Sequence, residues 1–222
     1  MEHSMNTEPI PNNDYFAKEL LNKLPKADPI FAAYEAQDVS REVGFDFASF
    51  TDVVPRALDE IRETKEAYEE GAEGRDHFGD EIADIMFSFV NLARHAGNTS
   101  LPTYDSFSDQ VAAVDLGDAS VEEIVDGIAD QISLLDSVAQ SNPEELQDAT
   151  LAAFNEGIIQ ASALAIREGF DPKELLTENV RKYLVRCDAI EQLAAEDGKT
   201  WADLSRENEI IAYWKRAKTL LN

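Results

Sequence analysis

The stretch Gly79-Asp-Glu-Ile-Ala-Asp-Ile-Met-Phe-Ser-Phe-Val-Asn-Leu-Ala-Arg-His-Ala-Gly97 decides the fold class of this chain. It is strongly apolar, and Gly97 is a typical stop for a helix. Polar residues recur along it at steps of three and four, so they form one narrow stripe on a helix. We predict a helix from about 75 to 96, whose polar stripe consists of His77, Glu81, Asp84, Ser88, Asn91 and His95.

Helix start and stop signals repeat on both sides of this stretch. Asp28-Pro29 is a cap followed by proline at the first helical position, and Ser120-Val-Glu-Glu123 is a capping-box pattern. No stretch alternates with period two, so the sequence predicts an all-α protein built as an antiparallel helical bundle. The other predicted helices lie near 14–24, 28–44, 51–71, 120–142, 143–169, 171–195 and 203–220.

A weak internal repeat suggests how the bundle is built. The helix pair at 52–97 ends in an apolar run, a basic residue and glycine, and the pair at 122–169 ends in the same order at the same spacing, Ala161-Ser-Ala-Leu-Ala-Ile-Arg-Glu-Gly169. Two similar helical hairpins could close a four-helix core within one chain, as an internal pseudo-dimer. The alternative is that any two amphipathic hairpins look alike.

Length and charge bound the function. The chain has 222 residues, and its 45 Asp and Glu against 19 Lys and Arg give a formal net charge of −26. We expect a mobile leader at 1–12 and a single domain at 13–222, which includes an inserted or duplicated hairpin at about 98–168. A strongly negative surface repels phosphate backbones and anionic lipids, so neither a nucleic acid polymer nor a membrane is expected as a partner.

Cysteine usage and hydropathy favour a cytoplasmic protein. Cys187 is the only cysteine, which excludes an intramolecular disulfide and fits a reducing compartment. No secretory signal is visible at the N-terminus. The strongly apolar stretch at 82–93 is interrupted by Asp84 and Asn91, and it is shorter than the roughly 20 residues that a membrane span requires. We therefore predict no transmembrane helix.

Two pairs of acids lie on consecutive predicted helices. Glu60 and Glu63 are three residues apart on the first, and Glu81 and Asp84 are three apart on the second, so each pair shares a helical face. The two pairs converge if the helices pack as an antiparallel hairpin. Ligand sets made only of oxygen suit a hard cation such as Mg²⁺, with Mn²⁺ as a substitute. The plain alternative is that the polar stripe is the solvated face of an amphipathic helix.

Three motifs occur together in this chain: Val43-Gly-Phe-Asp-Phe47, Ala57-Leu-Asp-Glu-Ile-Arg-Glu63 and the stretch that ends at Gly97. In combination they resemble the MazG family of all-α nucleoside triphosphate pyrophosphohydrolases. The resemblance covers about 41–97 and resumes at about 169–217. This second part contains Gly169-Phe-Asp-Pro-Lys-Glu-Leu-Leu, Asn179-Val-Arg-Lys-Tyr183 and the tail Trp214-Lys-Arg-Ala-Lys.

The resemblance implies a reaction and a site. It implies a nucleoside triphosphate substrate that is cleaved between the α and β phosphates to give monophosphate and pyrophosphate. It further implies that one or two Mg²⁺ ions are held by Glu60, Glu63, Glu81 and Asp84. In the family an asparagine and basic residues of a later helix approach the phosphates. The candidate substrate-binding residues here are Asn179, Lys182 and Arg186, together with Asn91 of the polar stripe.

Residues 98–168 replace the short connection that is usual in the family. If they form a second hairpin, the positions of the four acids are taken by Asp130, Ser133, Ala153 and Glu156, so we expect one competent metal site per chain. Relatives commonly dimerise, and we expect either a homodimer or an internally duplicated monomer.

The sequence also bears on two other classes of protein. Glu-x-x-His does not occur, which argues against a di-iron carboxylate bundle. The rival to the enzyme is a noncatalytic acidic helical binding protein, either a degenerate family member or a mimic of nucleic acid charge. Related helical enzymes act on dUTP or phosphoribosyl-ATP, so the base remains open.

Overall fold

The computed structural model describes residues 16–207 and 209–221, and the regular elements of these residues are all helical. The prediction of an all-α packed helical bundle is confirmed. The leader predicted at 1–12 and the first residues of the helix predicted at 14–24 lie outside the described residues. The α-helices are α1 (Phe16–Lys23), α2 (Pro29–Glu42), α3 (Phe50–Glu69), α4 (Arg75–His95), α5 (Ser108–Ala113), α6 (Val121–Ser141), α7 (Leu146–Arg167), α8 (Pro172–Glu196), α9 (Trp201–Glu207) and α10 (Ile210–Leu221).

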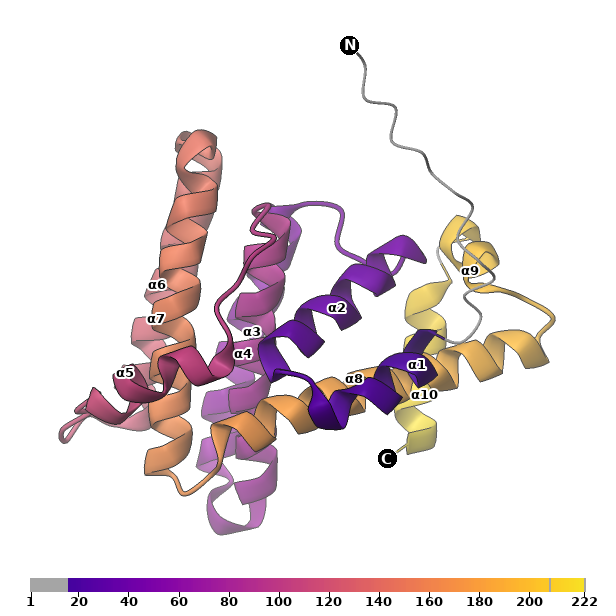
Figure 1. The fold of residues 1–222 in the computed structure, drawn as a ribbon. Helices are drawn as coiled ribbons and strands as arrows, with labels where there is room; N and C mark the ends of the chain where they lie inside the picture. Colours follow the sequence, from indigo (N-terminus) through magenta and orange to yellow (C-terminus); the bar gives the residue numbers. More distant parts are fainter. Residues whose placement is uncertain (1–15, 208, 222) are drawn as a thin grey trace.

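Helices α3, α4, α6 and α7 pack together as two hairpins (Figure 1). Helix α3 contacts α4 and α6, and α7 contacts the same two helices, so each hairpin covers the apolar side of the other. Phe89 of α4 and Phe154 of α7 are fully buried. Gly157 of α7 lies directly against the Phe89 ring, where an added methyl group would overlap it. The lack of a side chain at Gly157 therefore lets α4 and α7 approach each other.

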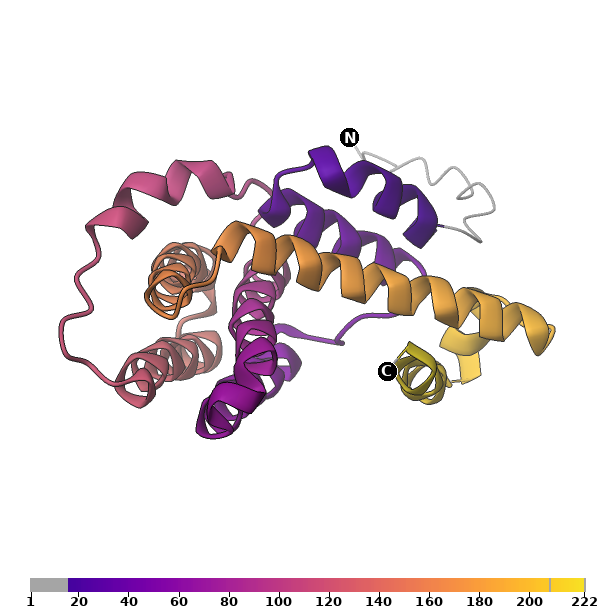
Figure 2. The same cartoon turned by 90° about the horizontal axis from the view of Figure 1, so that it is seen from below.

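The long helix α8 forms a second layer. It contacts α1, α2, α4 and α10, and Figure 2 shows it running across the bundle beside α1. Its residues Leu176, Val180, Leu184 and Cys187 are buried at steps of three and four, which defines the face that it turns to the core. Polar residues along one edge of this face contact α4.

The predicted helix ends are reproduced by real caps. The Asp28 carboxylate accepts from the backbone N–H of Ile30 at 3.0 Å, and Ser120 and Glu123 form the capping box in both directions. Gly97 has φ 87° and Gly169 has φ 82°, so each takes the left-handed conformation that commonly ends a helix.

Two expectations were wrong in detail. The helix predicted at 203–220 is divided into α9 and α10. No helix was predicted between 97 and 119, but this segment contains a 3₁₀ turn, Tyr104–Phe107, and α5. Buried Tyr104 and Phe107 explain this difference, because they anchor the connection to the bundle and give it local helical structure.

One helix also changes the assessment of hydropathy. Pro143–Arg167 is long and apolar enough to cross a membrane by length and composition alone, which the sequence prediction overlooked. Half of its most apolar window is buried inside the structure, and the core helix of a soluble protein meets the same criteria. Its apolar character is accounted for here by its position between α4 and α6.

Candidate metal centre

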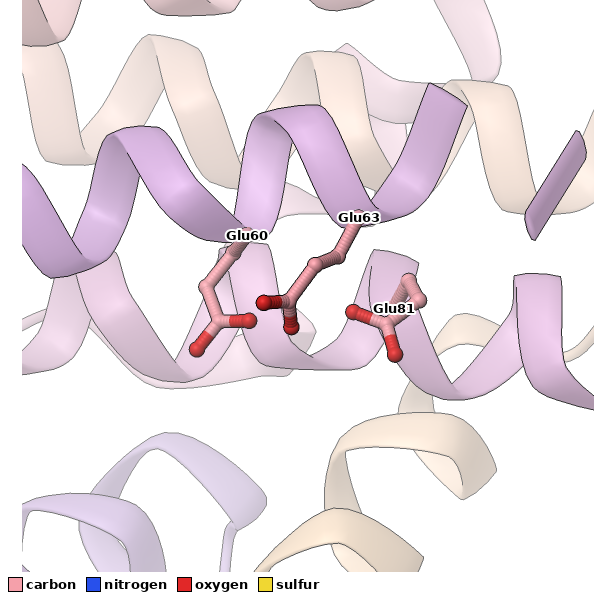
Figure 3. A group of neighbouring side chains, drawn as sticks. All are labelled: Glu60, Glu63 and Glu81. Carbon is pink, nitrogen blue, oxygen red and sulfur yellow. The ribbon is translucent and has the colours of Figure 1, made fainter. Parts of the chain in front are cut away.

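Helices α3 and α4 bring three of the four predicted acids together. One carboxylate oxygen from each of Glu60, Glu63 and Glu81 lies within 4.8 Å of the others (Figure 3). Among the described residues, this carboxylate group is the only set of three or more His, Cys, Asp or Glu side chains that could hold one ion. The spacing of three residues on each helix and the antiparallel packing of α3 on α4 produce it.

Two members of the group are buried without full compensation. Glu60 and Glu81 are buried, and Glu63 is partly buried. Within the described part of the chain, Glu60 Oε2 and Glu81 Oε2 are buried and have no hydrogen-bond partner. Burying a carboxylate without a partner is costly, so the group has unused capacity for a cation.

The burial of these carboxylates raises their pKa values. Burial, followed by the negative charge of Asp84, raises the pKa of Glu60 to about 8. Burial and the charges of Asp84 and Glu63 raise the pKa of Glu81 to about 7. Near neutral pH the protein without a metal therefore retains protons on carboxyls that would ionise in water, and a cation would have to replace them.

Asp84, the fourth predicted ligand, lies beside the group. Its Oδ1 accepts a hydrogen bond from Nδ2 of Asn179 at 2.7 Å. Burial raises the pKa of Asp84, while the Asn179 hydrogen bond and the charges of Arg56 and Arg186 act in the opposite direction. Asp84 is close enough to be the largest charged influence on both Glu60 and Glu81.

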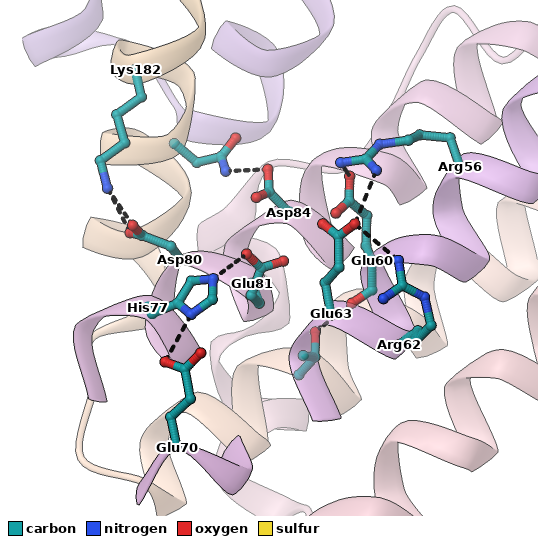
Figure 4. A network of polar contacts seen from close by, with 12 residues as sticks. Arg56, Glu60, Arg62, Glu63, Glu70, His77, Asp80, Glu81, Asp84 and Lys182 are labelled. Atoms are coloured by element: carbon teal, nitrogen blue, oxygen red, sulfur yellow. Dashed lines mark hydrogen bonds and ion pairs between the residues drawn. The ribbon is translucent and has the colours of Figure 1, made fainter. Parts of the chain in front are cut away.

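Arg56 is a residue of the site that the sequence prediction missed. Its Nη2 lies 2.5 Å from Glu60 Oε1, and its Nη1 lies 3.5 Å from Glu63 Oε1 (Figure 4). The spacing of four between Arg56 and Glu60 was the available signal, since such pairs share a helix face. His77 of the polar stripe also joins the site, with its Nε2 at 3.1 Å from Glu81 Oε1.

The candidates on α8 differ in position. Asn179 contacts Asp84 directly, and its neighbour Val180 is fully buried in the core. Lys182 Nζ donates to both carboxylate oxygens of Asp80 at 2.6 Å, next to the carboxylate group (Figure 4). Arg186 lies over the Trp214 ring, with its Cζ 5.6 Å from the ring centroid.

Asn91 belongs to a different cluster. Its side-chain oxygen accepts from Nη2 of Arg94 at 2.9 Å, and Arg94 also donates to Asp46 Oδ1 at 2.5 Å. Burial would raise the pKa of Asp46, but the hydrogen bonds from His95 and Arg94 outweigh it and lower that pKa to about 2. This cluster attaches the loop before α3 to the end of α4.

The second hairpin has no comparable centre among its described residues. Asp130, Ser133 and Glu156 are exposed, and Ala153 offers no ligand atom. Comparisons of the chain with protein-family models, with curated proteins and with solved structures gave no match.

Proposed function

We propose that this protein is a Mg²⁺-dependent nucleoside triphosphate pyrophosphohydrolase that cleaves between the α and β phosphates, as in the MazG family. The buried carboxylate group of Glu60, Glu63 and Glu81 carries the proposal. The motifs around it supply the reaction by resemblance. Its role would be cytoplasmic, either removing noncanonical nucleotides or trimming a nucleotide pool.

The chemistry of the donor set fits Mg²⁺, or Mn²⁺ as a substitute. Glu60, Glu63 and Glu81 offer only oxygen ligands. Two of these oxygens are buried and have no hydrogen-bond partner among the described residues. These three residues would hold the ion, with Asp84 beside them. A bound ion would polarise phosphoryl oxygens and lower the pKa of an attacking water.

The chain's own residues have separable tasks in this proposal. Asn179 orients the Asp84 carboxylate through its hydrogen bond. Lys182 and Arg186 of α8 place positive charge near Asp80 and Asp84, beside the carboxylate group. This charge favours the binding of a small polyanion to an otherwise acidic protein. A carboxylate of the group that is not engaged with the ion can accept a proton from the attacking water.

We also propose that the fold is a MazG-like four-helix core in which a duplicated hairpin, α6 and α7, takes the place of a partner subunit. The packing of α3 on α6 and of α4 on α7 supports this proposal. It predicts a monomer in solution, and a homodimer is the alternative. Sedimentation at several protein concentrations distinguishes the two.

The test is a panel of nucleoside triphosphates with Mg²⁺, including dUTP and deaminated purines, in which pyrophosphate is scored separately from orthophosphate. Glu81→Gln and Asp84→Asn should abolish pyrophosphate release while the protein stays folded. Glu156→Gln is the matched control, since it removes one exposed charge at the position of the second hairpin that corresponds to Asp84. If no nucleotide released pyrophosphate, the proposed enzyme activity would be overturned and the noncatalytic binding protein would be favoured.

A further inference from the structure

Arg56 places a fixed positive charge on the carboxylate group. It lies one helical turn before Glu60 on α3, and its guanidinium spans Glu60 and Glu63. The Glu60 side chain is 6% exposed, whereas that of Arg56 is 45% exposed. The arginine therefore reaches a buried acid from a position that is still open to solvent.

Arg56 and a metal ion compete for the same carboxylate. Glu60 Oε1, which accepts from Arg56 Nη2, belongs to a carboxylate that a divalent ion in this group would need. Burial acts to lower the pKa of Arg56, but Glu60, Glu63 and Asp84 outweigh it and raise that pKa, so the competing charge is permanent. Arg56 does not satisfy the group, because Glu60 Oε2 and Glu81 Oε2 remain without a hydrogen-bond partner among the described residues.

The other cations near the group are engaged differently. Arg62 reaches Glu63 at 3.2 Å, but it lies at the rim and also contacts Glu66 at 2.7 Å. Lys182 is paired with Asp80. Arg56 is thus the cation that is paired with buried Glu60, and its half-exposed, flexible stem allows it to leave.

We propose that Arg56 pairs with Glu60 and Glu63 while no metal is bound. When a divalent ion binds, Arg56 releases Glu60 and pairs with a phosphate of the nucleotide instead. This rests on the proposed function of the same site. The planar guanidinium suits bidentate contact with phosphate, so the exchange replaces one charge-assisted pair by another. Arg56 then weakens metal binding in the absence of nucleotide and strengthens nucleotide binding once metal is present, which makes the two cooperative.

The first experiment titrates Mn²⁺ calorimetrically into full-length, metal-free protein without nucleotide. Arg56→Gln should bind Mn²⁺ about 5-fold or more tightly than wild type, because the competing charge is gone. Arg62→Gln is the matched control, since it removes the same charge from the rim of the same helix, and its affinity should change much less. Arg56→Lys retains the charge and should stay close to wild type. Circular dichroism confirms that each variant is folded.

The second experiment measures a nonhydrolysable nucleoside triphosphate at saturating Mn²⁺. Arg56→Gln should bind this probe about 10-fold more weakly than wild type, the opposite direction to its change in metal affinity. Replacing a residue that only supports the fold would not increase the affinity for Mn²⁺ and decrease the affinity for the nucleotide probe.

The outcomes separate the two proposals. If wild type takes up no Mn²⁺, the metal centre and the proposed function fail. If wild type binds Mn²⁺ but Arg56→Gln does not bind it more tightly, or Arg62→Gln shows an equal gain, the role of Arg56 is overturned while the proposed function stands. Tighter Mn²⁺ binding with unchanged binding of the nucleotide probe overturns the exchange onto phosphate.

Discussion

The side-chain amide of Asn179 donates a hydrogen bond to Asp84 Oδ1 at 2.7 Å, joining residues 95 positions apart in the sequence. It connects the polar stripe of α4 to α8 at the edge of the carboxylate group. The hydrogen bond thereby joins two segments of the chain that are separated by residues 98–168.

If the proposed function holds, Asn179→Ala should lower kcat/KM for the nucleotide that is cleaved best by about 10- to 100-fold, as is typical when a residue that orients a ligand is lost. The reason is that Asp84 would lose the donor that fixes its carboxylate. Steady-state kinetics with pyrophosphate detection checks this. Thr177→Ala, which removes only a hydroxyl bonded within α8 on the exposed side, should leave kcat/KM unchanged. A wild-type rate for Asn179→Ala would show that the hydrogen bond does not serve the reaction.

Local signals were sufficient to predict most helices and the meeting of the acids. Caps such as Asp28 and stops such as Gly97 act within one turn of the chain, so they are readable without a structure. The convergence of Glu60, Glu63 and Glu81 follows from the spacing of three and from hairpin packing. The first inference needs only residues within one turn of the chain, and the second needs the helical period together with antiparallel packing of neighbouring helices.

Tertiary partners could not be predicted in this way. Asn91 lies on the predicted stripe, and its side chain accepts a hydrogen bond from Arg94. Arg94 also pairs with Asp46, which lies in a loop 48 residues earlier in the chain. The sequence places Arg56 next to Glu60 on the helix. Whether the Arg56 side chain pairs with the carboxylate group or extends into solvent depends on the burial of Glu60. Such choices are decided by desolvation, which a sequence pattern does not contain.

Glu81→Gln should stabilise the metal-free protein at pH 8 by on the order of 1 kcal/mol, because it replaces a buried charge that faces Asp84 and Glu63. Mg²⁺ should raise the Tm of wild type, through binding to the folded state, and leave the Tm of the variant nearly unchanged. Differential scanning calorimetry with and without Mg²⁺ measures both effects. A Glu81→Gln variant that is less stable than metal-free wild type would contradict the uncompensated charge.

Asp46→Asn should be less stable than wild type at pH 7 by about 2 kcal/mol, with the difference shrinking at pH 3. The folded pKa of Asp46 is lowered from 3.8 to about 2 by His95 and Arg94 against the effect of burial. A lowered pKa contributes stability above the unfolded value that is lost as pH falls through the folded value, at about 1.4 kcal/mol per pKa unit. Urea unfolding at both pH values tests this, with exposed Asp118→Asn as the control. An equal loss at pH 7 and pH 3 would exclude an ionic origin.

Gly157→Ala should destabilise the protein by about 1–3 kcal/mol, as expected when a methyl group is forced into a packed core. The methyl would overlap the Phe89 ring, which is fully buried between α4 and α7. Helix propensity alone predicts the opposite sign, since alanine is favoured over glycine by about 1 kcal/mol in a helix.

Gly127→Ala provides the matched comparison. Gly127 lies within α6, is exposed, and has no described atom within 4 Å of an added methyl group, so propensity should prevail and the variant should gain up to about 1 kcal/mol. Urea unfolding of the two variants isolates the contact, because the substitution and the type of element are the same. Opposite signs support close packing of α4 on α7, on which the proposed fusion of two hairpins depends. If both variants were stabilised, the two hairpins would not be in contact at Phe89.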